Sequence, residues 1–291
     1  MKKLPKKYYF NLKDFPLAIR KVEGNRVSHL HDYTGIPHYH NFSELVLITG
    51  GKGEQSVNGK FYPIVEGDIF IISGENVHYF TDYQNLRILN VMFDPSILGT
   101  RIDYLRKIPG YNLVFKIEPS LRTEKNFKNM LHLNRSQIVH AKAIIEEIEK
   151  ELDHHEPGYE AEAAAQFVRL IVYLSRNVGS KNTDRSSFLR LSVLLSSLED
   201  RFSENWTLDD MAHSVNMSKN NFIRVFKAAE NCTPMKYLNR LRLDAACRFL
   251  REKKRRISEI AYLCGFRDSN YFSKCFSATF KISPKEYRKR S

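Results

Sequence analysis

The feature that most constrains the fold of this 291-residue chain is an internal repeat in its last hundred or so residues. The segment LDDMAHSVNMSKNNFIRVFKAAENCTP is followed, 49 or 50 residues later, by ISEIAYLCGFRDSNYFSKCFSATFKISP. Each copy predicts a short helix, a tight turn at a residue that tolerates a left-handed backbone (Asn216 or Gly265), and a second helix. Matching positions are Phe222 with Phe272, Phe226 with Phe276, and Thr233-Pro234 with Ser283-Pro284. The repeat therefore predicts two helix-turn-helix units.

The net charge of the chain is concentrated in the same region. From Lys181 onward there are 23 lysines and arginines against 12 acidic residues, whereas residues 1–179 hold 23 against 21. A basic excess confined to one part of a chain is typical of a surface that binds a polyanion. The charge therefore predicts a double-stranded DNA partner for the C-terminal part, with a merely solvated basic surface as the alternative.

The first part of the chain has a different periodicity. Residues 15 to about 95 are rich in Val, Ile, Leu and aromatic residues, and Gly or Asn-Gly interrupts these runs at intervals of about ten residues. Asn58-Gly59 lies between two such runs and is a strong signal for a two-residue hairpin. Short, evenly spaced strands favour an antiparallel sandwich or small barrel, and a barrel of this size can hold a small ligand in its mouth.

Helical patterns follow the strands. Two amphipathic helices are predicted over about 136–177, a polar linker over 180–187, and short helices with Gly, Asn, Ser or Pro between them from Phe188 onward. The predicted fold is thus two-domain: an antiparallel β-barrel plus helices over 1–179, and an all-α double helix-turn-helix domain over 188–291.

One predicted helix carries an apolar seam at steps of three and four residues. A seam of this kind, flanked by charge, is typical of a helix that packs against another helix. We expect it to form the interface of a homodimer, with packing onto the chain's own barrel as the alternative. The seam residues are Ile138, Ala141, Ile145, Ile148 and Leu152.

The C-terminal region resembles the DNA-binding domain of AraC-type transcription regulators. The resemblance spans about Phe188 to Arg290 and rests on RLRLDAACRFL, ISEIAYLCGFRDSNYFSKCF and SPKEYR in that order. It implies that a long helix, about Pro234 to Arg251, joins the two helix-turn-helix units. It also implies that their second helices enter successive major grooves, about 34 Å apart.

The outward positions of these second helices are the candidates for reading bases. Phe222 and Phe226 have core spacing in the first, and Phe272 and Phe276 have it in the second. Asn pairs with adenine, Arg with guanine and Asp with cytosine, while a solvated or phosphate-contacting side chain is the alternative at each position. The candidates are Lys219, Asn220, Ile223, Arg224 and Lys227 on the first helix, and Asp268, Asn270, Ser273 and Lys274 on the second. By the resemblance, Asn220, Ile223 and Arg224 face the groove. The segment 251–256, REKKRR, is expected to contact phosphate or solvent.

A second group of candidates lies in HYHNFSE. His38, His40 and Glu44 have even numbers, so on an extended strand they share a face. With GDIFIISGENVH, the segment resembles the paired motifs of the cupin barrel, in which His78 is the fourth matching ligand. The cupin pattern commonly has Pro-Pro-Gly before this last histidine, whereas this chain has Ser73 to Val77 there.

Three interpretations of His38, His40, Glu44 and His78 stay open. The four residues line a polar effector pocket, hold a transition-metal ion such as Fe, Mn, Ni or Zn, or are structural histidines. The first is favoured, because AraC-type sensor domains with such histidines usually bind ligands without catalysis. The barrel also resembles the rhamnose-operon regulators of the family, which implies a monosaccharide effector.

Several classes of protein are excluded. The chain has no run of 18 apolar residues, no apolar core after its N-terminal lysines and no CxxC pair, so we expect a cytoplasmic protein that neither spans a membrane nor carries a secretory signal. It has no GxSxG, no Walker-type loop and no GxGxxG before a helix, so no enzyme activity or cofactor is expected.

The sequence thus predicts a transcription regulator, expected to be an activator. Its partners would be DNA, a sugar-like effector, RNA polymerase and a second copy of itself. Two alternatives remain: a metal-dependent cupin enzyme fused to a DNA-binding domain, and a regulator whose barrel only dimerises.

Overall fold

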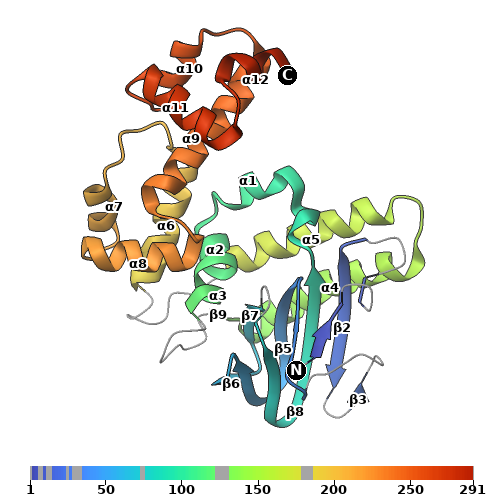
Figure 1. Ribbon diagram of the computed structural model, residues 1–291. Coiled ribbons are helices and arrows are strands. Elements are labelled where there is room, and N and C mark those ends of the chain that lie inside the picture. The colour runs from blue at the N-terminus through green and yellow to red at the C-terminus, as the bar shows by residue number, and fades with distance from the viewer. Residues whose placement is uncertain are drawn as a thin grey trace. The chain divides into compact units, whose positions relative to one another are not determined.

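The computed structural model describes residues 2–5, 9–10, 15–23, 26–27, 35–72, 76–121, 131–177 and 186–290. The chain divides into two compact units, Met1–Leu189 and Arg190–Ser291 (Figure 1). The predicted linker, 180–187, lies mostly outside the described residues. Its last two residues already belong to the helix α6 (Ser186–Asp200).

The N-terminal unit is built on one nine-stranded sheet. Its strands are β1 (Lys2–Leu4), β2 (Leu17–Glu23), β3 (Arg26–Val27), β4 (His38–His40), β5 (Ser43–Val57), β6 (Lys60–Val65), β7 (Asp68–Ile72), β8 (His78–Phe93) and β9 (Leu131–His132). The main path of the sheet is β1-β4-β8-β5-β7-β9, while β2 pairs with β8 and β6 pairs with β5. Strands β1 and β9 lie outside the predicted span of about 15–95.

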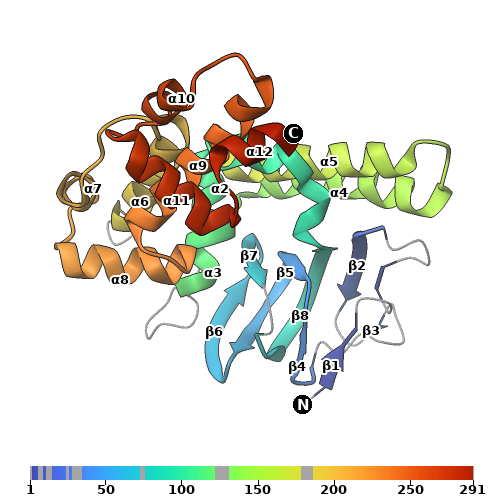
Figure 2. The ribbon, with the colours of Figure 1, turned by 45° about the horizontal axis from the view of Figure 1, so that its top comes forward.

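Two long strands, β5 and β8, hold the sheet together. The first part of β5, near Glu44, pairs with β7, and its last part, near Val57, pairs with β6 (Figure 2). Between these two parts, the pairing of β5 with β8 shifts in register. The architecture is cupin-like, as predicted. Among the described residues, however, the strands do not close into a hydrogen-bonded barrel, and β1 pairs with β4 in parallel rather than antiparallel.

The β5–β6 hairpin turns at the predicted pair. Val57 and Lys60 are opposite each other, so Asn58 and Gly59 form a two-residue loop. Their φ angles are 50° and 78°, which is the backbone that a type I′ turn needs at both positions. The Asn58 side chain also accepts from the backbone N–H of Val77, which ties the hairpin to the start of β8.

Two long helices pack beside the sheet, where the first of them contacts β2. Helix α4 (Arg135–His154) begins at a capping box between Asn134 and Gln137, and α5 (Tyr159–Arg176) packs along it (Figure 1). The segment that joins the sheet to α4 contains short helices: η2 (Pro95–Arg101), α1 (Ile102–Leu105), α2 (Pro109–Asn112), η3 (Leu113–Ile117) and α3 (Glu118–Leu121).

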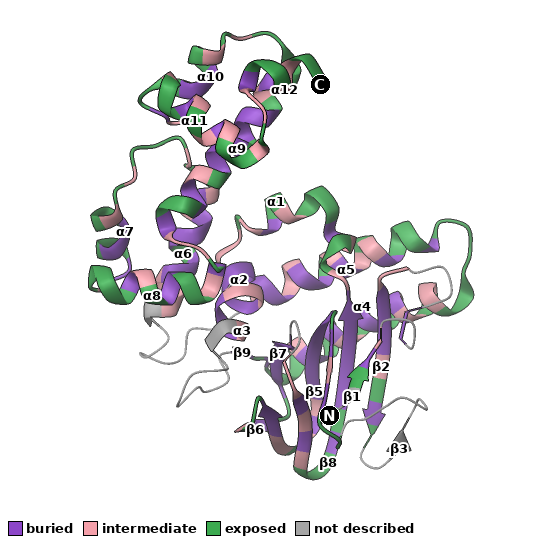
Figure 3. Cartoon of the chain, viewed as in Figure 1, coloured by how far each residue is buried: buried purple, intermediate pink, exposed green. Residues whose placement is uncertain are grey.

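The predicted dimer seam is covered by its own chain. Ile138, Ala141, Ile145 and Ile148 are buried, since α4 packs against α5 and β2, and Leu152 is partly buried (Figure 3). The assignment of these five residues to a dimer interface is therefore wrong. The regular apolar spacing reflects packing within the chain, which was the alternative.

The C-terminal unit is all helical. It contains α7 (Leu208–Ser214), α8 (Lys219–Glu230), α9 (Pro234–Glu252), α10 (Ile257–Leu263), α11 (Ser269–Phe280) and α12 (Pro284–Arg290), after α6. The turns within the two helix-turn-helix units lie at Asn216 (φ 53°) and Gly265 (φ 82°). The four phenylalanines at core spacing, Phe222, Phe226, Phe272 and Phe276, are fully buried, which confirms the inward faces of α8 and α11.

No helix in the described ranges combines the length and apolar character that crossing a membrane requires.

Candidate nucleic-acid interface and buried polar cluster

Helix α8 presents its polar face to the outside. Lys219, Asn220, Arg224 and Lys227 are exposed and Ile223 is half-buried. The helix begins at the Ser218 N-cap, whose side chain accepts from the backbone N–H of residue 221. A direct consequence of the burial of Phe222 and Phe226 is that a stripe of amide and guanidinium groups, which are donors suited to base edges, lies on the solvent side.

Two of the four base-reading candidates on α11, Asp268 and Ser273, make hydrogen bonds to the backbone of their own helix. The Asp268 carboxylate caps the helix by accepting from the backbone N–H groups of Asn270 (3.1 Å) and Tyr271 (2.8 Å). Ser273 is half-buried, and its hydroxyl donates to the carbonyl of Ser269 (2.9 Å). Asn270 and Lys274 are exposed and remain the candidates best placed to meet DNA.

Two outward residues at matching places in the repeat were missed. Asn221 on α8 is exposed and its side-chain oxygen accepts from Arg224 (3.1 Å). Tyr271, fifty residues later on α11, keeps 52% of its surface exposed. The offset of the repeat pairs Asn221 with Tyr271 and was the signal that could have found them. In the sequence, however, a tyrosine next to Phe272 suggests a core residue.

The basic segment between the two helix-turn-helix units is exposed. Helix α9 ends at Glu252, its C-cap Lys253 has a left-handed backbone (φ 57°), and α10 begins after Arg256. Arg255 pairs with Glu252 (2.6 Å). The other basic side chains of 251–256 are exposed, and that of Arg251 also donates to the Tyr287 hydroxyl (3.0 Å).

A buried polar cluster lies between strands β4, β5 and β8. His38 and His40 come from β4, Glu44 from the start of β5 and His78 from the start of β8, directly opposite His38. The exposed fraction of each is 6% or less. Buried groups of this polarity need partners within the protein or a ligand.

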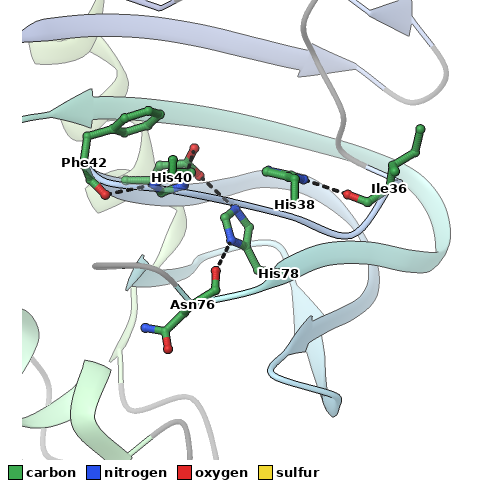
Figure 4. A network of polar contacts seen from close by, with 7 residues as sticks. Ile36, His38, His40, Phe42, Asn76 and His78 are labelled. Carbon is green, nitrogen blue, oxygen red and sulfur yellow. Dashed lines mark hydrogen bonds and ion pairs between the residues drawn. The ribbon is translucent and has the colours of Figure 1, made fainter. Parts of the chain in front are cut away.

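The backbone orients all three imidazoles in the same way. Nδ1 of His38, His40 and His78 lies 2.7, 2.9 and 2.9 Å from the carbonyl oxygens of Ile36, Phe42 and Asn76 (Figure 4). Because a carbonyl only accepts, each Nδ1 carries a proton. The other ring nitrogen, Nε2, is therefore the one that a ligand or an acid would meet.

Glu44 lies between two of these nitrogens. Its carboxylate oxygens are 3.1 Å from His40 Nε2 and 3.7 Å from His78 Nε2. Despite this proximity, neither Nε2 makes a hydrogen bond of good geometry with any described residue. His38 lies beside the group, with its ring centre 4.3 Å from that of His78.

The cluster shifts the protonation of its own members. Burial raises the pKa of Glu44, but His40, His78 and His38 outweigh it and lower the pKa to about 2. Burial lowers the pKa of His78 to about 3, against the opposing effect of Glu44. At neutral pH, Glu44 is a carboxylate and His78 a neutral imidazole.

Gly67 and Asp68, the other residues of the second cupin-like motif, lie outside the polar cluster and stabilise a turn. Asp68 Oδ2 accepts from the backbone N–H of Val65 (3.0 Å), and its Oδ1 is bound by His132 Nδ1 (3.1 Å). Gly67 has φ 95°, and a Cβ there would lie 2.5 Å from the carbonyl oxygen of Leu133. Gly67 and Asp68 therefore shape the turn between β6 and β7 and its contact with β9.

Both parts of the chain match known families. Residues 211–290 match the helix-turn-helix domain family, and residues 26–171, half of the chain, match the AraC-like ligand binding domain. The chain belongs to the AraC family of transcription regulators. It is a DNA-binding regulator with a ligand-binding domain.

This AraC-family regulator is similar to named transcriptional activators over most of its length. It is 28% identical over 253 residues to the transcriptional activator RhaR of Mannheimia succiniciproducens, covering 87% of each chain. It is also 28% identical over 251 residues to the activator RhaS of Escherichia coli, covering 86% of each. A crystallised AraC-type regulator from Chromobacterium violaceum is 32% identical over 35% of this chain and 90% of its own, with a TM-score of 0.32. RhaR and RhaS are both named as transcriptional activators, not as enzymes.

The AraC-like ligand binding region also contains a polar residue that the sequence analysis missed. Asn90 lies two residues from Met92, which is opposite Glu44, so Asn90 faces the same side of the sheet as Glu44. It is buried, and its side-chain oxygen has no partner among the described residues. A single Asn within the apolar run LRILNVMF was the signal that could have found it.

Proposed function

We propose that this regulator activates transcription by reading an operator with α8 and α11, in response to a monosaccharide bound in its N-terminal unit. The observation that carries the DNA part is the outward polar face of α8. Its exposed Asn220 and Arg224 have the donor geometry that adenine and guanine accept in the major groove. Asn270 and Lys274 offer the same chemistry on α11.

Single substitutions on these faces test the groove assignment. Arg224→Ala and Asn270→Ala are each expected to weaken operator binding by about 1–3 kcal/mol and to relax preference at one base pair, since each removes a base contact. Lys253→Ala is the matched control: it removes a charge from the exposed segment, so it should weaken all sequences alike. Footprinting over a salt series measures both effects. Protection equal to the parent's in both variants would refute the assignment.

The effector part rests on the polar lining of the sheet. A sugar buries many hydroxyls, and each buried hydroxyl needs a partner. His38, His40, Glu44 and His78, joined by Asn90, supply donors and acceptors on adjoining strands. The monosaccharide class comes from the likeness to the rhamnose-operon regulators, and effector binding would act by favouring one arrangement of the two units.

Thermal-shift measurements with L-rhamnose and related monosaccharides test the effector. A saturating sugar should raise the melting temperature of the N-terminal unit, with about 2.7 kcal/mol of added stability at a hundred times its Kd. The rise should disappear in His40→Ala and persist in His140→Ala, which changes an exposed histidine on α4. Absence of binding by calorimetry to any monosaccharide would leave the N-terminal unit with a role in assembly only.

The remaining partners are part of the same proposal. An activator contacts RNA polymerase, and a homodimer would place two copies on two half-sites in the cytoplasm. Since the seam of α4 is covered, the dimer would use another surface.

A further inference from the structure

We infer that Arg242 positions α11 for DNA by clamping the loop between α6 and α7, residues 201–207, against the second helix-turn-helix unit. The inference deepens the proposed function and rests on it, because it concerns how α8 and α11 are held while they read an operator. Arg242 is on α9 and keeps only 9% of its surface exposed, so it acts through other residues and not by touching bases.

The two helix-turn-helix units are joined through α9. Helix α7 packs against α8 and α8 against α9, while α10, α11 and α12 each pack against α9. One shared helix sets the distance between α8 and α11, but each unit could still tilt about its own contacts with that helix. A second tie would fix the relative orientation of α8 and α11, which have to meet successive major grooves at the same time.

The loop between α6 and α7 belongs to the first unit. It begins directly after α6 and ends at Thr207, the N-cap of α7. Within the loop, the ring nitrogen of Trp206 donates to the carbonyl of Arg201 (2.8 Å), and the Arg201 guanidinium lies over the Trp206 ring, 5.2 Å from its centre. These contacts make the loop a compact element, so its position follows that of α7.

The same loop contacts the second unit at its turn. Phe202 packs against the core cluster that contains Phe272 and Phe276 of α11. A Cβ at Gly265 would lie 2.5 Å from the carbonyl oxygen of Ser203, so the backbone of the loop and that of the turn approach each other closely. Because this turn directly precedes α11, a displacement of the loop would also displace α11.

Arg242 holds the loop in this place with the planar fork of its guanidinium. Its Nε donates to the carbonyl of Phe202 (2.9 Å) and its Nη2 donates to the carbonyl of Glu204 (2.8 Å). The guanidinium carbon lies 5.8 Å from the centre of the Phe266 ring, one residue after the glycine of the turn. Movement of the loop would leave a buried charge without these partners, which is costly. A lysine has a single ammonium group and cannot reproduce the fork.

A double-mutant cycle for operator binding by the full-length protein tests the inference. Asn270→Ala on α11 and Arg224→Ala on α8 are each measured in the parent and in Arg242→Met. Arg242→Met should weaken binding by at least about fivefold, and in that background Asn270→Ala should cost less than about twofold instead of about 5- to 150-fold. Arg224→Ala should keep its full effect. Arg240→Met is the matched control, because Arg240 is an exposed arginine on the same helix, and it should leave both effects unchanged.

The cycle separates positioning from a loss of stability. A residue needed only for folding would lower the amount of active protein, which a titration with excess operator measures, and would leave the cost of Asn270→Ala unchanged. An unchanged cost in Arg242→Met would therefore refute the inference. If Arg242→Met does not fold, the cycle is run with Arg242→Lys, which keeps the charge and the alkyl chain. Binding like the parent's by Arg242→Lys, with the full cost of Asn270→Ala, would also refute it.

The proposed function can fail separately from the inference. If Asn270→Ala has no effect in the parent, DNA reading by α11 is rejected, and the inference with it. If Asn270→Ala costs as much in the Arg242 variants as in the parent, the proposed function is retained and only the inference is rejected.

Discussion

Replacing Ile145 by aspartate is expected to unfold the N-terminal unit. Ile145 is completely buried on the face of α4 that packs against α5 and β2. A carboxylate there would have no partner, and the change also removes a branched side chain from a close-packed contact. Its cost, at least about 4 kcal/mol, is comparable to the whole stability of many domains. Circular dichroism and calorimetry should show the loss of the unfolding transition that belongs to the N-terminal unit.

Val139→Asp is the matched control on the same helix. Val139 keeps 63% of its surface exposed, so the same carboxylate should change stability by no more than about 0.5 kcal/mol. If Ile145→Asp instead stayed folded with an unchanged melting temperature and only a reduced mass in sedimentation, the seam would be a subunit interface and the packing described for α4 would be incorrect.

Replacing Gly265 by valine is expected to abolish operator binding. Gly265 has φ 82°, a backbone that a β-branched residue adopts only at a cost of about 1–3 kcal/mol. A Cβ at this position would also lie 2.5 Å from the carbonyl oxygen of Ser203, which belongs to backbone and cannot move aside. The turn between α10 and α11 would be lost, and with it the placement of Asn270. Gel-shift titration measures the effect.

Gly158→Val is the control that separates the cost of a positive φ angle from the cost of a steric clash at Cβ. Gly158 also has positive φ (94°), but nothing lies within 4 Å of the place where its Cβ would be, and it belongs to the N-terminal unit. This variant should lose some stability and bind the operator normally. Normal operator binding by Gly265→Val would mean that the second helix-turn-helix does not need this turn.

The parts that the sequence predicted well are those with local physical signals. Asn58-Gly59 specifies its turn through two residues that tolerate positive φ, and the phenylalanines of α8 and α11 repeat at helical spacing around a buried core. His40, Glu44 and His78 lie together, as the motif implied, but alternation on one strand was the wrong reason, because a bend at residues 41–42 places Glu44 on β5 rather than on β4. The signals for the turn and for the helix faces lie within a few residues of the features that they predict.

The parts that the sequence could not predict depend on distant partners. The spacing of Ile145 and Ile148 shows that one face of α4 is apolar, but not whether its own chain or a second copy covers it. Asp268 was a candidate for reading a base, but its carboxylate accepts from two backbone N–H groups of α11 and so caps that helix in the free protein. His38 is on the same strand and in the same motif as His40. Its ring nevertheless lies beside His78, outside the close group of His40, Glu44 and His78.

Helix α9 is shared by the cores of both helix-turn-helix units. Its first half contributes Tyr237, whose ring contacts Phe226 of α8, and its second half contributes Leu250 to the cluster that contains Phe272 of α11. A continuous helix of 19 residues is about 28 Å long and turns by about 100° per residue. The addition or loss of one residue would change both the distance and the relative rotation of α8 and α11. If α8 and α11 both contact the operator as proposed, α9 fixes the distance between the two DNA segments that they contact. Surface changes on α8 and α11 would then alter the sequence that is bound but not this distance.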